Sequence, residues 1–208
     1  MDVDWQTKLS NGLPIQNKMP IQRTLVIIAG GKSSRMQRDK ALLPFGGYST
    51  LSEYQYQRFK PFFSNIYLST KENKFNFPCS IISDKYKDSS PLVALISIFE
   101  TLDVDEVFIL SVDSPFIPIE VCEKLYSISK DEDSIIVAKS NFGLEPLCGI
   151  YKRSILSIAK DRLNENRHRL QSLLSEVNTK EVYFENEELF MNLNHPHEYE
   201  DAKLKLLS

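Results

Sequence analysis

A short run of small, hydroxyl-bearing and basic residues follows the first apolar stretch of the chain. Residues Thr24 to Ile28 are apolar or β-branched and predict a buried strand, and Ala29-Gly30-Gly31 follows it. The next positions carry basic residues and serines with one acid among them: Lys32, Ser33, Ser34, Arg35, Arg38, Asp39 and Lys40. Exposed backbone N–H groups, hydroxyls and cations after a strand are suited to hold an anion, of which a nucleotide phosphate is the most economical.

The size and charge of the chain limit the classes of function. A length of 208 residues with 42% apolar residues predicts one domain over residues 21–208, preceded by an N-terminal extension over residues 1–20. The net charge of −3 argues against a nucleic-acid partner. The sequence has no apolar run of about 18 residues, and residues 1–20 do not resemble a signal peptide. We therefore expect a cytoplasmic protein that has no membrane partner and keeps its three cysteines reduced.

Apolar periodicity and turn residues predict strands that alternate with helices. Further strands are expected at 65–70, 80–83, 106–112, 134–138, 147–151 and 180–184. Helices are expected at 50–60, 91–102, 119–128, 154–163, 168–177 and 196–206, the first of which opens with a capping-box pattern at Thr50. This alternation predicts an α/β fold: a Rossmann-like three-layer sandwich with a mostly parallel sheet and helices on both faces.

The segment between Ala29 and Lys40, called the Gly30 loop below, follows an expected strand, and two carboxylates also follow expected strands. Asp84 follows the strand at 80–83, and Asp113 follows the strand at 106–112. In open parallel sheets ligands bind beyond the carboxyl ends of the strands, so these residues are expected to share one site. The loop matches neither of the two best-known phosphate loops, because Gly30 and Gly31 are adjacent and no Gly-Lys-Ser/Thr follows at the required spacing.

The loop resembles the signature of small-molecule nucleotidyltransferases. The pattern Ala29-Gly-Gly-x-Ser-x-Arg-Met, followed by Asp39-Lys40-Ala-Leu-Leu, is most similar to that of the molybdenum cofactor guanylyltransferases. The resemblance covers roughly residues 24 to 200 and includes Ile82-Ser-Asp84, Ser90-Pro-Leu92, Val112-Asp-Ser-Pro-Phe116 and Phe190-Met-Asn-Leu-Asn-His-Pro196. The chain departs from the family at Gln37, Ser90 and Ala94, where the family has glycine.

The resemblance implies the nucleotide-diphospho-sugar transferase-like form of the fold, GTP and the molybdopterin cofactor as substrates, and Mg²⁺ as the cofactor. It also implies transient contacts with proteins that donate or accept the molybdenum cofactor. The residues expected to contact the nucleotide or the second substrate are Ile28, Ala29, Gly30, Gly31, Lys40, Asp84, Asp113, Asn192 and Asn194.

Three residues are expected to act in the transfer itself. Arg35 and Lys40 can meet the negative charge that grows on a pyrophosphate leaving group. Asp113 is suited to hold Mg²⁺, which takes few protein ligands. Asp84 can accept two hydrogen bonds from the N1–H and amino group of guanine. Each of these residues also has a purely structural interpretation. Arg35 and Lys40 would then belong to a solvated charged loop, Asp113 would form a turn, and Asp84 would cap a helix or turn.

Weaker candidates and rival functions follow from the same residues. Asn192 and Asn194 can equally serve turn and helix-cap chemistry before Pro196. Glu145 and the basic cluster Arg167-His168-Arg169 are lesser candidates for contacts with the second substrate. The rival activities are nucleotidyl transfer from CTP to molybdopterin, or transfer to a sugar phosphate or cobinamide phosphate. A non-catalytic protein that binds GTP or the cofactor is the alternative from another class.

Overall fold

The computed structural model describes residues 21–30 and 38–206 of the chain. The strands are β1 (Ile21–Ile28), β2 (Phe63–Thr70), β3 (Ser80–Ser83), β4 (Glu106–Ser111), β5 (Ile135–Ser140), β6 (Gly143–Lys152) and β7 (Thr179–Tyr183). The α-helices are α2 (Leu51–Phe59), α3 (Pro91–Thr101), α4 (Ile119–Ile128), α5 (Leu156–Asn164), α6 (Leu170–Leu174) and α7 (Pro196–Lys205). Short 3-10 turns are η1 (Lys40–Leu42), η2 (Arg153–Ile155) and η3 (Glu187–Phe190).

The strands form a seven-stranded sheet in the order β3-β2-β1-β4-β6-β5-β7. β1 pairs in parallel with β2 and β4, β2 with β3, and β5 with β7. β6 runs antiparallel to both of its neighbours, β4 and β5. The predicted mostly parallel sheet is therefore confirmed, with β6 as the reversed strand.

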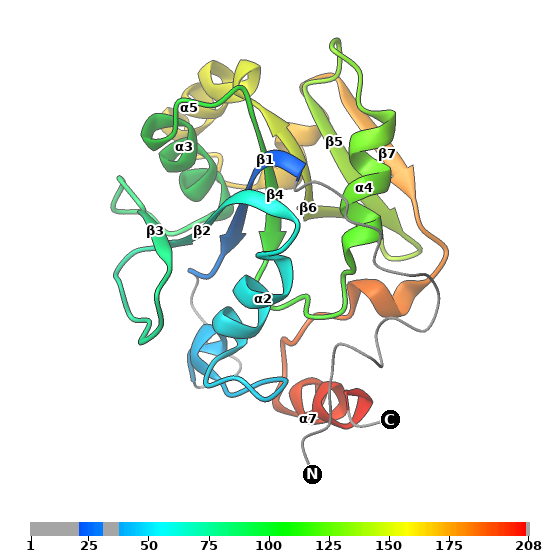
Figure 1. The fold of residues 1–208 in the computed structure, drawn as a ribbon. Helices are drawn as coiled ribbons and strands as arrows, with labels where there is room; N and C mark the ends of the chain where they lie inside the picture. Colours follow the sequence, from blue (N-terminus) through cyan, green and yellow to red (C-terminus); the bar gives the residue numbers. More distant parts are fainter. Residues whose placement is uncertain (1–20, 31–37, 207–208) are drawn as a thin grey trace.

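The central strands are apolar on both faces, and each face is covered by its own helices (Figure 1). In β1, Leu25 and Ile27 face one core, to which α2 and α4 contribute most of the helical side chains. Val26 and Ile28 face the other core, which is covered by α3, α5 and α6. Side chains alternate across a strand, so a strand buried on both faces reads as a continuous apolar run. The predicted three-layer arrangement is confirmed.

Helix starts agree with the capping signals in the sequence. The Thr50 side chain accepts a hydrogen bond from the backbone N–H of Glu53, at 3.0 Å, at the start of α2. Ser90 does the same for α3 by accepting from the N–H of Val93 at 3.2 Å, with Pro91 at the first helical position. None of the helices within residues 21–30 and 38–206 is long and apolar enough to cross a membrane.

Two expected elements differ from those observed. The strand expected at 147–151 begins earlier, because β5 and β6 form a hairpin whose return starts at Gly143, where φ is +123°. The helix expected at 168–177 is only the short α6. It ends there because the Thr179 hydroxyl donates to the carbonyl of Leu174 at 2.7 Å and the chain turns into β7.

Candidate functional site

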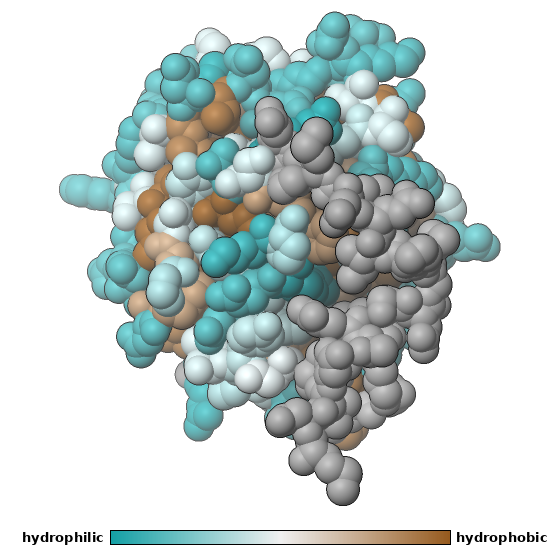
Figure 2. All heavy atoms as spheres, viewed as in Figure 1, coloured by the Kyte–Doolittle hydropathy of each residue, from teal (hydrophilic) through white to brown (hydrophobic). Residues whose placement is uncertain are grey.

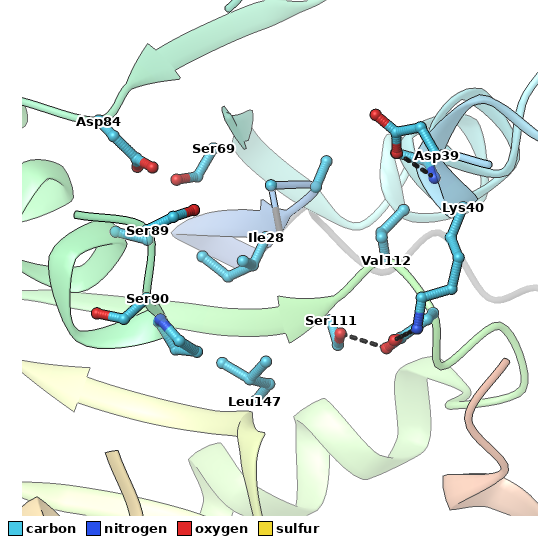
Figure 3. Close-up of a pocket in the computed structure, with 16 residues that line it drawn as sticks. Ile28, Asp39, Lys40, Ser69, Asp84, Ser89, Ser90, Ser111, Val112 and Leu147 are labelled. Carbon is cyan, nitrogen blue, oxygen red and sulfur yellow. Dashed lines mark hydrogen bonds and ion pairs between the residues drawn. The ribbon is translucent and has the colours of Figure 1, made fainter. Parts of the chain in front are cut away.

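A cavity of about 300 Å³ opens at the carboxyl edge of the sheet. Residues from the ends of β1, β2 and β4, the start of α3 and the turn η1 line it, together with Asp84 and Leu147. Figure 3 shows Asp84, Ser69, Ser89 and Ser90 at one side, Lys40 and Ser111 at the other, and Ile28 between them. On the face seen in Figure 2 the described surface is mainly hydrophilic, with small apolar areas between the polar side chains.

One end of the cavity holds a charged cluster that joins three distant segments. The Lys40 ammonium donates to Asp113 Oδ2 at 2.6 Å and to the amide oxygen of Asn194 at 3.0 Å. Lys40 comes from η1, Asp113 follows β4, and Asn194 precedes α7. The Lys40 and Asp113 side chains are only 16% and 18% exposed, so bulk water screens their attraction less than at an open surface. These three sequence-predicted residues therefore meet.

The turn that carries Asp113 is fixed from several directions. The Ser111 hydroxyl donates to Asp113 Oδ1, and the backbone N–H of Leu193 donates to the Asp113 carbonyl at 2.9 Å. Gln55 on α2, which is fully buried, donates from Nε2 to the carbonyl of Ser114 at 2.9 Å. A carboxylate held by this many contacts is preorganised, which suits a residue that orients charge rather than one that moves.

The two asparagines before α7 have different surroundings. Asn194 Oδ1 contacts the Lys40 ammonium, and the Asn194 N–H donates to Glu198 Oε2 at 2.6 Å. Asn192 Oδ1 instead accepts a hydrogen bond of 2.6 Å from the Ser114 hydroxyl and so ties the η3–α7 segment to the turn after β4. Glu198 also accepts a hydrogen bond of 2.7 Å from the backbone N–H of His195, which is the N-cap residue of α7. Asn194 thus joins the charged cluster, and Asn192 supports the backbone beneath it.

The other end of the cavity holds the half-buried carboxyl group of Asp84. The backbone N–H of Asp84 donates to the Thr70 carbonyl at 3.2 Å, which fixes the residue just beyond β3. Its Oδ1 is buried and has no hydrogen-bond partner in the described part of the chain, and the same holds for the hydroxyl of Ser69. Burial raises the pKa of Asp84, and the nearby Lys71 offsets part of that rise. A buried acceptor without a donor is costly, so this end of the cavity has an unused capacity to accept hydrogen bonds.

The beginning of the Gly30 loop lies between these two ends. The N–H of Val112 donates to the Ile28 carbonyl at 3.1 Å, and the N–H of Ala29 donates to the Ser69 carbonyl at 2.9 Å. Ile28, Ala29 and Gly30 all line the cavity. Gly31 and Arg35, which were also expected to contact phosphates, lie outside the described residues.

An irregular pairing in the β5–β6 hairpin adds an apolar wall. Val137 pairs with Gly149, but the next residue, Ala138, pairs with Glu145, so β6 carries extra residues between these pairs. Leu147 lies in this stretch and lines the cavity. A Cβ at Gly149 would lie 2.6 Å from the Ile136 carbonyl oxygen, so the two backbones approach as closely as glycine allows.

The weaker candidates lie outside the cavity lining. Glu145 accepts a hydrogen bond from Ser140 at 2.8 Å, and burial raises the pKa of its carboxyl group while that bond lowers it. Arg167 pairs with Glu165 at 2.9 Å and with Glu176. His168 contacts the Ser90 hydroxyl at 3.3 Å and is the member of its basic cluster that reaches the edge of the cavity.

Sequence reasoning missed several polar residues of the cavity. Ser69 is the next-to-last residue of β2, and Ser111 is the last residue of β4. Both line the cavity. Their position near the ends of two expected strands was a signal in the sequence, whereas the register that sets Ile28 opposite both of them is visible only in the structure. Leu147 had no such signal, since only the irregular pairing of β6 brings it to the cavity.

Cation binding at this site would rest on few protein ligands. Within residues 21–30 and 38–206, no group of three or more His, Cys, Asp or Glu side chains is arranged to hold a metal. Mg²⁺ needs only one or two carboxylates when substrate phosphates and water complete its shell. Asp113, at the edge of the cavity and with lone pairs beyond those used by Lys40 and Ser111, fits that requirement.

The fold and the site together define an α/β protein with a polar, charge-bearing cavity at the carboxyl edge of its sheet. Residues 25–182 match the model of the MobA-like NTP transferase domain. The chain belongs to this family. It is 40% identical to a molybdenum cofactor guanylyltransferase of Campylobacter jejuni over 183 residues, which is 87% of this chain and 95% of that protein. It is 32% identical to the enzyme of the same name from Helicobacter pylori over 195 residues, which is 91% and 94% of the two chains.

Solved structures confirm the fold. The molybdopterin-guanine dinucleotide biosynthesis protein A of Archaeoglobus fulgidus superposes with a TM-score of 0.76 at 17% identity, covering 88% of this chain and 97% of that one. A CMP:2-keto-3-deoxy-manno-octonic acid synthetase superposes with a TM-score of 0.73 at 14% identity, covering 90% and 99%. The fold is the Rossmann-like one of nucleotide-diphospho-sugar transferases.

Proposed function

We propose that this protein transfers GMP from GTP to the terminal phosphate of the molybdopterin cofactor and releases pyrophosphate. The observation that carries the proposal is the division of one cavity into two ends. Asp84 offers a buried acceptor at one end, and Lys40, Asp113 and Asn194 form a charged cluster at the other. This division suits a nucleotide, because the base can donate hydrogen bonds to a carboxylate whereas the anionic triphosphate binds cations. The name shared by the relatives from Campylobacter and Helicobacter supports the same activity.

Asp84 is the residue we assign to the base. An ionised carboxylate accepts two hydrogen bonds side by side, and the N1–H and amino group of guanine donate such a pair. Adenine and cytosine do not present two adjacent donors of this kind. The Asp84 Oδ1 atom, which has no partner within the described residues, would gain one from guanine. The hydroxyl of Ser69, buried nearby in the same cavity, can accept or donate as the base requires.

The transfer itself is a displacement at the α-phosphorus of GTP. A terminal phosphate oxygen of the cofactor forms the new bond, and the bond from the α-phosphorus to the oxygen bridging the α- and β-phosphates breaks. The electron pair leaves with pyrophosphate, whose negative charge grows in the transition state. Lys40 is the preplaced cation of the described site that would meet this charge. The cofactor phosphate is already an anion, so no covalent intermediate on the protein is needed.

Asp113 would hold Mg²⁺, with substrate phosphates and water as the other ligands. Bound there, the ion would neutralise phosphate charge. Lys40 contacts Asp113 in this structure, and the same ammonium is placed to donate to phosphates at this end of the cavity. Asn194 also accepts a hydrogen bond from the Lys40 ammonium and can help to keep it at this end of the cavity.

The direct test is incubation of the purified protein with labelled GTP, Mg²⁺ and the molybdenum cofactor. Release of pyrophosphate together with a cofactor that carries labelled GMP is the expected result. A thermal-shift panel of GTP, CTP, UTP and ATP with Mg²⁺ tests the base. Stabilisation by CTP alone would favour cytidylyl transfer. GTP binding with no transfer, beside an active guanylyltransferase control, would favour a protein that only binds the nucleotide. The cytoplasmic location and the division into an N-terminal extension over residues 1–20 and one domain over residues 21–208 stay predictions.

A further inference from the structure

The loop between β2 and β3 carries a lysine, Lys74, that contacts both ends of the segment between β1 and η1. The Lys74 ammonium donates to the Ala29 carbonyl at 3.0 Å and also to Asp39 Oδ2. Ala29 directly follows β1, and Asp39 directly precedes η1. The Gly30 loop runs between these two points, and both Ala29 and Asp39 line the cavity. One side chain therefore ties the two ends of the loop together.

Lys74 is better anchored than a typical surface lysine. Its own neighbour Phe75 is buried, with 8% exposure, and packs against Phe77. The Asn73 side chain closes the turn by accepting a hydrogen bond of 3.2 Å from the Phe75 N–H. The Lys74 side chain is 23% exposed, and its partner Asp39 is 35% exposed. The ammonium is thus held at the loop by a fixed backbone rather than placed there by a chance surface contact.

Asp39 links the contact made by Lys74 to the position of the adjacent residue, Lys40. Asp39 Oδ1 accepts from the N–H of Ala41 at 3.0 Å and so caps η1, while its Oδ2 accepts from Lys74. The next residue, Lys40, points the other way to Asp113. Displacement of the Asp39 carboxylate would therefore disturb the start of η1 and the backbone that carries the Lys40 ammonium. A misplacement of about 1 Å at a reacting group can cost on the order of a hundredfold in rate.

We infer that Lys74 is a positioning residue for phosphate binding: it joins Ala29 to Asp39 and, through Asp39, sets the place of the Lys40 ammonium. The inference rests on the proposed function only in that the end of the cavity at Lys40 receives a polyphosphate. It does not depend on guanine or on the second substrate.

The test measures binding of inorganic triphosphate with Mg²⁺, which needs the Lys40 end of the cavity but no base. Lys74→Met should weaken this binding at least about tenfold, because Ala29 and Asp39 lose their common donor and the Lys40 backbone loses its support. Lys74→Arg, which keeps the charge and several donors, should stay within about threefold of the wild type. Guanosine binding, followed by ligand-observed NMR, should be unchanged in both variants. Lys160→Met is the matched control, since Lys160 also forms a 2.6 Å ion pair, with Glu100, away from the cavity lining.

The variant Asp39→Asn distinguishes a positioning role of Lys74 from a purely electrostatic effect on triphosphate binding. This change removes a negative charge near the phosphates, so an electrostatic effect alone would tighten triphosphate binding. If Lys74 acts by positioning, Asp39→Asn should instead weaken it, as Lys74→Met does, and the double variant should be little worse than either single one. The inference is wrong if Lys74→Met binds triphosphate as tightly as the wild type, if Asp39→Asn tightens binding, or if the wild type does not bind triphosphate. Failure of guanylyl transfer with intact triphosphate binding would contradict the proposed function alone.

Discussion

The Lys40 ammonium lies 2.6 Å from Asp113 Oδ2, although 73 residues separate them in the sequence. Each charge therefore neutralises the other. The two groups have complementary needs in a phosphate-transfer site, because a carboxylate can bind a cation and an ammonium can bind a phosphate. Arrival of a metal–triphosphate complex would replace one ion pair by two favourable contacts. The ion pair between Lys40 and Asp113 also reduces the cost of keeping two charges in a half-buried cavity, because neither charge is left unpaired.

Lys40→Met should lower guanylyl transfer at least about a hundredfold, because the cation that meets the charge on the leaving pyrophosphate is lost. Asp113→Asn should lower it comparably and raise the Mg²⁺ concentration needed for half-maximal rate. Initial rates of pyrophosphate release against GTP and Mg²⁺ concentration measure both effects. Lys203→Met, which removes a lysine of an exposed ion pair on α7, is the control and should leave the rate unchanged. Full activity in Lys40→Met would contradict the assigned role.

The preference for GTP over ATP should depend on pH through Asp84. Burial raises the pKa of this carboxyl group, so it ionises at a higher pH than an ordinary aspartate. Only the ionised form accepts both guanine donors. The ratio of GTP to ATP affinity should therefore rise as pH increases through the acidic range and then level off. Taking the ratio cancels phosphate ionisation, which both nucleotides share. Isothermal titration calorimetry between pH 4.5 and 7.5 checks this, and a flat ratio in the wild type would rule the assignment out.

Asp84→Asn should stabilise the ligand-free protein at pH 7 while it weakens GTP binding. The pKa of Asp84 is raised in the folded state, so the folded protein binds a proton at this carboxylate more tightly than the unfolded chain does. Protonation of Asp84 therefore contributes favourably to the free energy of unfolding. This contribution is fully present below the unfolded-state pKa of about 3.9 and is lost as pH rises through the folded-state pKa. At pH 7 the buried charge is a net cost, which Asn removes. The melting temperature should therefore rise at pH 7, and the gain should vanish in acid.

Asn194 and Asn192, only two positions apart, should give different phenotypes. Asn194→Ala removes an acceptor of the Lys40 ammonium and should lower kcat/KM at least about tenfold, with little change in stability. Asn192→Ala leaves the Ser114 hydroxyl without its acceptor and should destabilise the fold by about 1 kcal/mol. Steady-state kinetics and urea unfolding of both variants separate the effects. Equal kinetic losses in the two would argue that both amides face the substrates.

The sequence was informative where local patterns decide the structure. Continuous apolar strands predicted the central sheet, and carboxylates after strands predicted that Asp84 and Asp113 would share one edge. It could not show the reversal of β6 or the irregular pairing that brings Leu147 to the cavity, because strand order and register depend on contacts between distant segments. The clamp by Lys74 was hidden for the same reason: its partners lie 45 and 35 residues away in the chain.

Ser90, at a position where the resemblance described for the sequence predicts glycine, should stabilise the fold. Its hydroxyl accepts a hydrogen bond from the Val93 N–H and caps α3, and it also contacts His168. Ser90→Ala should lower the unfolding free energy by about 1 kcal/mol and the melting temperature by about 2–4 °C. Ser90→Gly should cost only a few tenths of a kcal/mol, roughly, because glycine leaves the N-cap backbone open to water. Urea unfolding at pH 7 ranks the three proteins. If Ala proves as stable as Ser, the hydroxyl does not cap the helix in solution, and its place in the cavity wall would be the remaining reason for a serine at this position.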